Sequence, residues 1–333
     1  MTQRAMSPMT RCIVTVMLLL ASQPAAAFDL QGHRGARGLA PENTLPAFAK
    51  ALAIGVHTLE LDVAITRDGQ IVISHDPALN PDLTRGPDGQ YLATRGPLIS
   101  QLSLHELRRY DVGRIKPGTH YAGLYPEQQA IDGTRVPLLT ELFALLKKAG
   151  NSQVRLDIET KINPMASHET LAPELFARAL IRTLRDAGMA SRTTIQSFDW
   201  RSLQVVQKEA PEILTAYLSA QQKFLDNIGA DQAAPSPWTA GFQYQDHGSV
   251  PKMVKAAGGR VWSVFHGDLD ADKLREAKAL GLTVLVWTVN HPALISKLMD
   301  LGVDGLISDR PDLVRAEMAR RGLPLPAATP VDP

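Results

Sequence analysis

The segment from Glu60 to Asp76, ELDVAITRDGQIVISHD, places acidic residues inside an aliphatic run typical of a buried strand. Side chains alternate along a strand, so Glu60 and Asp62 share one face and the flanking leucines take the other. Two carboxylates at this spacing repel each other and lose solvation unless a cation lies between them. A hard divalent ion such as Mg²⁺ or Ca²⁺ fits best, because both prefer oxygen ligands.

The same segment contains a hairpin signal. Asp68-Gly69 is a favoured two-residue turn between antiparallel strands. In a regular hairpin with this turn Asp62 lies directly opposite His75, and opposed residues point to the same side of the sheet. The pattern therefore predicts that His75 lies beside the acidic pair, provided that no bulge shifts the pairing.

A third acidic position follows from the stretch RLDIETK, residues 155–161. Asp157, Glu159 and Lys161 alternate in the same way and share one face of a predicted strand. Glu159 lies nearer the carboxyl end and is the predicted third metal ligand, with the Lys161 charge beside it. The alternative is that these acids form ion pairs with Arg and Lys at a strand end.

Other strand ends carry residues that suit phosphate chemistry. His33 and Arg34 follow the first predicted strand within the glycine-rich run GHRGARG. Arginine grips a phosphate with parallel hydrogen bonds, and histidine carries a proton near neutral pH. Gln196 is either a hydrogen-bond donor to a substrate or a barrel-interior residue. Trp287 either packs on the carbon skeleton of a small polyol or belongs to the core.

Strand-like and helix-like stretches alternate along the chain. The strand candidates are residues 29–35, 57–65, 153–161, 193–198, 213–218, 259–265, 282–290 and 303–309. Helical patterns separate most of them, as in 173–188 and 271–281. Eight such units predict a (β/α)8 TIM barrel. A doubly wound sheet is the alternative, because residues 241–245 read as a ninth strand.

Residues 1–27 are predicted to form a cleaved signal peptide. Two arginines precede a short apolar run at 12–21, and Ala25 and Ala27 mark a cut before Phe28. We therefore expect a periplasmic or secreted protein. The alternative, a membrane anchor, is disfavoured because spanning a bilayer takes about 20 apolar residues.

The rest of the chain divides into a barrel, an insertion and a tail. The barrel is predicted at 28–320, and a Gly- and Pro-rich stretch at about 77–137 is too long for a plain connection. We expect it to be an inserted subdomain after the second strand, at the mouth where substrate enters. Residues 321–333 are expected to be a frayed C-terminal tail.

Composition excludes some classes of protein. The chain has 333 residues and a formal net charge of +1, which argues against a nucleic-acid partner and against stable association with a membrane. Cys12 is the only cysteine and precedes the predicted cut, so the mature chain has no disulfide and must be stabilised by packing.

The blocks GHRGARGLAPENTLPAF and LELDVAITRDGQIVISHD resemble the glycerophosphodiester phosphodiesterase family, with support from LDIETK, SFDW, VLVWTVN and GVDGLISDRPD. The resemblance covers most of the mature chain. It implies a TIM barrel with a small insertion after the second strand. It also implies hydrolysis of small-molecule glycerophosphodiesters, which are deacylated phospholipids, to sn-glycerol 3-phosphate and an alcohol.

The resemblance further implies roles for individual residues. The family's catalytic histidines match His33 and His75, and its ligands for one divalent cation, Ca²⁺ or Mg²⁺, match Glu60, Asp62 and Glu159. Its phosphate-contacting cations match Arg34 and Lys161, and its substrate-packing aromatic residue matches Trp287. Residues 221–258 have no clear counterpart in the family.

Three other functions fit parts of the pattern. A phosphodiesterase lyase related to sphingomyelinase D would release a cyclic phosphate and would need an apolar cleft rim for lipid tails, whereas the inserted segment is polar. A non-catalytic phosphodiester-binding protein would have lost a histidine or a metal acid, and none is missing here. A barrel isomerase or aldolase would need no second histidine on the metal face.

Overall fold

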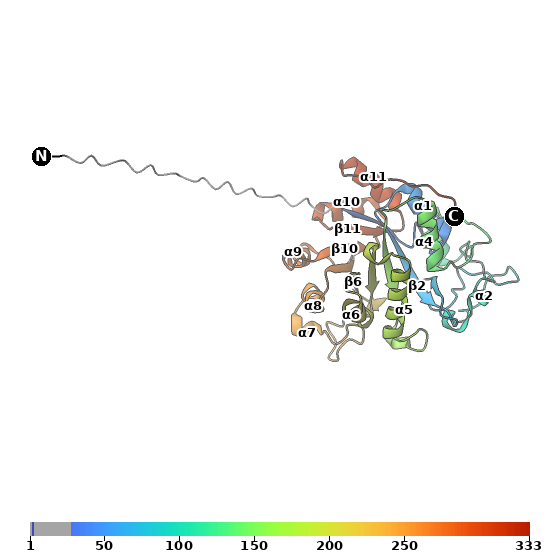
Figure 1. Ribbon diagram of the computed structural model, residues 1–333, viewed down its shortest axis with the longest axis horizontal. Coiled ribbons are helices and arrows are strands. Elements are labelled where there is room, and N and C mark those ends of the chain that lie inside the picture. Colours follow the sequence, from blue (N-terminus) through green and yellow to red (C-terminus); the bar gives the residue numbers. More distant parts are fainter. Residues whose placement is uncertain (1, 3–27) are drawn as a thin grey trace.

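The structure is a computed structural model that describes Thr2 and residues 28–333 (Figure 1). The predicted signal peptide lies outside the described residues, apart from Thr2. Within the described part of the chain, no helix is both long enough and apolar enough to cross a membrane.

Eight parallel strands form a closed barrel whose neighbours follow chain order. They are β1 (Asp29–Gly32), β2 (Thr58–Ile65), β4 (Arg155–Thr160), β5 (Thr193–Ser197), β6 (Leu214–Ser219), β9 (Val261–Phe265), β10 (Thr283–Trp287) and β11 (Gly305–Ser308). β1 pairs with both β11 and β2, which closes the barrel and confirms the predicted fold. Residues 241–245 are not a ninth strand, since they form a turn and the start of α7 (Tyr244–His247).

Helices surround the barrel and cover its outer face (Figure 1). They are α1 (Leu45–Ile54), α4 (Leu139–Lys148), α5 (Pro173–Asp186), α6 (Trp200–Glu209), α8 (Val250–Ala256), α9 (Ala271–Ala279), α10 (Pro292–Leu301) and α11 (Pro311–Arg320). Leu59, Leu61 and Val63 of β2 point outward and are fully buried in the shared core. The alternate residues of β2 therefore point into the barrel.

A threonine and a glycine fix the ends of α1. The Thr44 hydroxyl accepts a hydrogen bond from the Ala47 N–H and so caps the helix. Gly55, with φ of 85°, ends it. Asn43 is thereby free for the contact with the barrel interior described below.

The hairpin after β2 differs from the prediction by one residue. β3 (Ile71–Ile73) pairs with β2 so that Ile65 faces Ile71, and Ser74 rather than His75 lies opposite Asp62. The turn has three residues, 67–69, because the Thr66 N–H donates to the Gln70 carbonyl at 3.0 Å. Gly69 ends this turn at φ 78°, the arrangement of a three-residue hairpin loop. The two-residue turn, and the pairing of Asp62 with His75, were therefore wrong.

The inserted segment after β3 folds against this hairpin. It contains η1 (Ile99–Gln101), α2 (Leu104–Leu107) and α3 (His120–Leu124). Its own apolar cluster includes Ile99, Leu107 and Val136, which pack with Ala64 and Val72 of the hairpin. Figure 1 shows α2 on one side of the barrel, beside β2.

A second additional segment lies between β6 and α8. It begins with a small hairpin, β7 (Gln221–Gln222) and β8 (Leu225–Asp226). The Gln221 N–H and the Gln222 amide both donate to the Asp268 carboxylate, at 2.8 and 2.6 Å. This hairpin is thus anchored to the loop that follows β9.

The C-terminal tail is not frayed, in contrast to the expectation. The Thr329 N–H donates to the Leu52 carbonyl at 2.9 Å, and the Asn151 amide donates to the Thr329 hydroxyl at 2.9 Å. Arg315 holds the Pro326 carbonyl at 2.7 Å. These contacts tie the tail to the end of the barrel at which the loop after α1 leads into β2. Figure 1 shows the C-terminus beside α1.

Candidate active site

Three carboxylates from two adjacent strands meet inside the barrel at its carboxyl end. In the parallel pairing of β2 and β4, Asp62 lies beside Glu159, and Glu60 lies one step lower on the same face. One oxygen from each of Glu60, Asp62 and Glu159 lies within 4.8 Å of the others, and all three side chains are buried. The alternation in the sequence correctly predicted this convergence.

Burial and the neighbouring charges shift the pKa values of these acids in different directions. Burial, reinforced by the charge of Asp62, raises the pKa of Glu60 well above its usual range. Burial also raises the pKa of Glu159 to about 7, although Lys161 opposes the shift. The pKa of Asp62 is lowered, because His75, Arg34 and Lys161 together outweigh its burial. A bound divalent cation would relieve this repulsion and keep all three ionised.

The acids are held by a tight turn after β1. Glu60 accepts hydrogen bonds from the Arg34 N–H and from the Gln196 amide, both at 2.9 Å. Asp62 accepts one from the Asn43 amide at 2.9 Å and lies 3.3 Å from the Arg34 guanidinium. Arg34 and Asn43 both have positive φ, 49° and 55°, which turns their polar groups toward the strand. Gln196 contacts Glu60 inside the barrel and also lines the smaller cavity described below, so its position fits both of the roles expected for it.

His33 is oriented by a carboxylate from the far end of the chain. Its Nδ1 lies 2.6 Å from Asp309, which Arg37 and Asn290 also hold at 2.8 and 2.7 Å. Because a carboxylate can only accept, Nδ1 carries the proton, and Nε2 lies 3.8 Å from Glu60. Burial, together with Arg37, lowers the pKa of His33 to about 4, so the ring is neutral at neutral pH.

His75 has a matching arrangement on the other side of the acids. Its Nδ1 lies 2.8 Å from Asp76, whose second oxygen accepts from the Asn80 amide at 2.8 Å. Its Nε2 lies 3.0 Å from Lys161 Nζ, which in turn lies 2.8 Å from Glu159. Burial, then Arg34 and Lys161, lowers the pKa of His75. His75 reaches the site because the chain leaves β3 after Ile73, and not through the predicted strand pairing.

The inserted segment supports Arg34 and Arg37 from outside the barrel. Arg34 forms an ion pair with Glu42 at 2.6 Å, and the Tyr121 hydroxyl donates to the same carboxylate. The Arg37 guanidinium lies over the Tyr125 ring at 4.7 Å. Both tyrosines belong to the insertion, which therefore packs beside the turn that carries Arg34 and Arg37.

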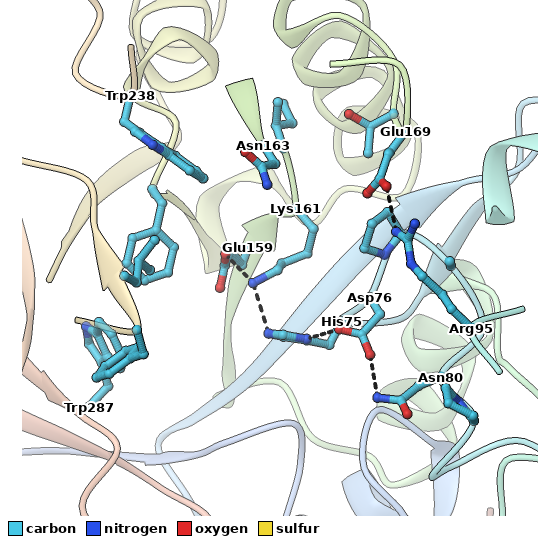
Figure 2. Close-up of a pocket in the computed structure, with 18 residues that line it drawn as sticks. His75, Asp76, Asn80, Arg95, Glu159, Lys161, Asn163, Glu169, Trp238 and Trp287 are labelled. Atoms are coloured by element: carbon cyan, nitrogen blue, oxygen red, sulfur yellow. Dashed lines mark hydrogen bonds and ion pairs between the residues drawn. The ribbon is translucent and has the colours of Figure 1, made fainter. Parts of the chain in front are cut away.

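Two adjoining cavities open from the acidic cluster. The smaller, of about 130 Å³, lies among His33, Arg34 and Glu60. The larger, of about 660 Å³, extends outward past His75 and Lys161 (Figure 2). Trp287 lines both cavities, as Glu159 and Phe198 do. The indole N–H of Trp287 donates to the Ser263 carbonyl at 3.1 Å. Eight of the nine residues predicted for the site therefore line one or both of these spaces, and Asp62 lies beside them in the carboxylate cluster.

Several residues of the site were not predicted from the sequence. Asp309 directly follows β11, so its place at a strand end was a usable signal. Asn43 and Glu42 lie just before α1 and were not predicted to belong to the site. Tyr121 and Tyr125 carried no signal, because nothing in an irregular insertion indicates where it folds back.

The chain matches a family model, the glycerophosphoryl diester phosphodiesterase family, over residues 33–313. The chain belongs to this family. A glycerophosphodiester phosphodiesterase of Caldanaerobacter subterraneus is 27% identical over 87% of this chain and 97% of its own length. The family places the protein among the glycerophosphodiester phosphodiesterases, which are phosphoric diester hydrolases.

Solved structures of the family share the barrel. One from Silicibacter pomeroyi, named as a glycerophosphoryl diester phosphodiesterase, is 34% identical, covers 90% of this chain and 96% of its own, and superposes with a TM-score of 0.80. An Oleispira antarctica phosphodiesterase, in complex with the product sn-glycerol-3-phosphate, is 24% identical. It covers 87% of this chain and 96% of its own at a TM-score of 0.63, which shows the common fold.

Proposed function

We propose that this enzyme hydrolyses glycerophosphodiesters to sn-glycerol 3-phosphate and an alcohol, using one divalent cation and two histidines as general acid and base. The observation that carries the proposal is a buried cluster of three carboxylates with a histidine on each side, each histidine tied to its own aspartate. The product bound to the Oleispira antarctica relative supports the choice of glycerol phosphate.

The residues that would hold the cation are Glu60, Asp62 and Glu159, which offer only oxygen atoms. This donor set suits Ca²⁺ or Mg²⁺. When bound, the ion would supply Lewis-acid stabilisation of the charge on the phosphate oxygens.

Arg34 and Lys161 are suited to hold the phosphate. Both cations border the small cavity, and the Nε of Arg34 is buried 3.3 Å from Asp62 without forming a hydrogen bond to any of the described residues. A buried donor of this kind is satisfied by an incoming oxygen anion. Lys161 already bridges Glu159 and His75, so its charge lies between a metal ligand and a proton carrier.

The two histidines can carry the protons of the reaction. In displacement at phosphorus the attacking and leaving oxygens lie roughly in line, so a base and an acid are needed on opposite sides. His33 and His75 each commit Nδ1 to an aspartate and leave Nε2 facing the acidic cluster. One removes the proton from the attacking group, and the other returns a proton to the departing alkoxide.

Apolar side chains around the larger cavity favour a second candidate, the lyase reaction that releases a cyclic phosphate. Phe224 and Trp238 come from the segment after β6 and give the cavity an apolar side that the polar insertion does not. In that reaction a hydroxyl of the substrate, rather than water, attacks phosphorus. Phosphorus NMR of the accumulating product separates the two, because a cyclic diester and a phosphate monoester give different signals.

The deciding assay is release of glycerol 3-phosphate from a panel of glycerophosphodiesters, with and without EDTA. We expect EDTA to abolish release and Mg²⁺ or Ca²⁺ to restore it. Glu159→Gln removes one ligand charge at nearly constant size and should weaken calorimetrically measured metal binding. Full activity of the chelated enzyme would overturn the metal assignment.

A further inference from the structure

The larger cavity has two unlike sides. Figure 2 shows Trp238 and Trp287 on one side, facing Asp76, Arg95 and Glu169 across the opening. Together with Phe198 and Phe224, the two tryptophans form what we call the aromatic wall. A cavity that begins at the phosphate site and is much larger than the space around His33 has room for the alcohol part of a diester.

The aromatic wall is built on anchored backbone. The Trp238 carbonyl accepts a hydrogen bond from the Trp200 N–H at 2.8 Å, at the start of α6. The buried Asn227 bonds to the Ala220 N–H at 2.9 Å, just before the hairpin that carries Phe224. These contacts hold the segment after β6 in place beside the cavity.

Core packing does not explain Phe224. Its side chain is 65% exposed at the tip of the hairpin between β7 and β8. It meets Phe265 edge-on at 5.3 Å, and Phe265 in turn contacts Trp287. A large apolar ring held at the mouth of a cavity is typical of a ligand contact.

The charged groups opposite the wall already have partners. Glu169 forms an ion pair with Arg95 at 2.7 Å, and Asp76 is bonded to both His75 and Asn80. A primary ammonium group would have to compete with these pairs for a carboxylate. A quaternary ammonium group donates no hydrogen bonds and is attracted instead to the faces of aromatic rings. Phe198 already faces a cation, since Lys161 Nζ is 5.8 Å from its ring centre, which leaves the other three rings of the wall for the head group.

We propose that the larger cavity binds the alcohol part of the substrate and that the aromatic wall selects a quaternary ammonium head group, such as that of choline. Phe224 and Trp238 are then specificity-determining residues. The inference rests on the proposed hydrolysis of glycerophosphodiesters, and it assigns a chemical class to the alcohol that is released.

The first test compares two diesters that differ only in charge. Glycerophosphocholine carries a trimethylammonium group, and the glycerophosphoryl ester of 3,3-dimethylbutanol carries a neutral tert-butyl group of nearly the same shape. We expect kcat/KM to be ~3–30-fold higher for the cationic ester, the range expected from cation–π attraction. Equal values for the two esters would overturn the proposal.

Substitutions in the aromatic wall test whether its rings cause the preference for the cationic ester. Phe224→Leu and Trp238→Leu keep apolar bulk and remove the ring, so each should lower kcat/KM severalfold more for the cationic ester than for the neutral ester. Leu214→Ala is a matched control, because Leu214 is also an exposed apolar residue but lies at the start of β6. An equal loss of kcat/KM for both esters in the leucine variants would show that the wall does not distinguish a charged head group from a neutral one.

A binding measurement separates this inference from the proposed reaction. Choline and 3,3-dimethylbutanol can be titrated against the wild-type protein by tryptophan fluorescence, because two tryptophans line the cavity. We expect tighter binding of choline, and weaker choline binding in Trp238→Leu measured by calorimetry. If no diester is hydrolysed but choline binds in this way, the reaction is wrong and the head-group site stands; equal binding of both alcohols contradicts the site.

Discussion

At the scale of single residues, the site is organised by carboxylates that fix other side chains. Asp309 and Asp76 each hold the Nδ1 of a histidine, so both Nε2 atoms face the acidic cluster. The two arrangements differ in what lies next to Nε2, which is Glu60 for His33 and Lys161 for His75. Acid–base catalysis of a displacement requires a base and an acid on two sides of one site, and two positioned imidazoles can supply them.

Replacing either histidine should therefore slow the chemical step. We expect His33→Ala and His75→Ala each to lower kcat by at least ~100-fold, the lower range for loss of general acid–base help, while calorimetric metal binding persists. His105→Ala is the control, since His105 is exposed on α2. Near-normal kcat in either variant would show that this histidine is structural.

At the scale of elements, the turn after β1 brings His33 and Arg34 to the acids. Gly35 has φ of 85°, and a Cβ there would lie 2.7 Å from the carbonyl carbon of Ala47 in α1. Close approach of this turn to α1 thus depends on the missing side chain.

Gly35→Ala should destabilise the protein more than a similar change in an open turn. Gly69 is the comparison, because it also has positive φ, 78°, but a Cβ there would meet nothing within 4 Å. Both variants place a Cβ in a backbone conformation with positive φ. The difference between their unfolding free energies therefore measures crowding against α1. We expect Gly35→Ala to lower the unfolding free energy by at least ~2 kcal/mol more than Gly69→Ala in denaturant titrations. Equal losses would mean that the turn can move away from α1.

His57, just before β2, is a titratable residue that contacts β1. The Leu30 N–H donates to His57 Nδ1 at 3.2 Å, which requires that nitrogen to be unprotonated. Burial, then Arg155 and Arg315, lowers the pKa of His57 below its ordinary value of 6.5, although Asp29 opposes the shift. Below pH 6.5 the unfolded chain therefore takes up a proton that the folded chain does not yet bind.

Stability should fall as the pH drops below about 6.5, in part because of His57. His57→Gln keeps an acceptor for the Leu30 N–H but cannot titrate, so its Tm should decline less between pH 7.5 and 5.5. The comparison is His105→Gln, at an exposed site. The same pH dependence of Tm in wild type and His57→Gln would contradict this role.

At the scale of the whole molecule, the two additional segments lie at the same end of the barrel. The larger cavity is lined on one side by Asp76 and Arg95, from the start of the insertion, and on the other by Phe224 and Trp238. The barrel supplies the acids and the cations, and the two loops determine what can reach them. Loop variation on a constant barrel is how this fold changes specificity.

The predicted export concerns the whole chain. The apolar run followed by Ala25 and Ala27 predicts cleavage before Phe28. We expect N-terminal sequencing of protein from the periplasm or the medium to begin at Phe28. Large charged residues at positions 25 and 27 should leave the precursor uncut. Wild-type protein that retains Met1 in the cytoplasm would contradict export.

The sequence alone determined the barrel and most of the site. Strand and helix periodicities are local, so eight strands and the shared face of Glu60 and Asp62 could be predicted within a few residues. The carboxyl ends of parallel strands then meet at one rim, which explains why Glu159 and His33 were assigned correctly to the same place.

Only the tertiary structure decided the hairpin register and the partners of the two histidines. One extra turn residue moved Ser74 opposite Asp62, and local sequence did not distinguish a two-residue from a three-residue turn. His33 and Asp309 are 276 residues apart, and such contacts depend on barrel closure rather than on any local pattern. The aromatic wall arises in the same way, because irregular loops carry no periodicity and their side chains are placed only by the contacts that they make on folding.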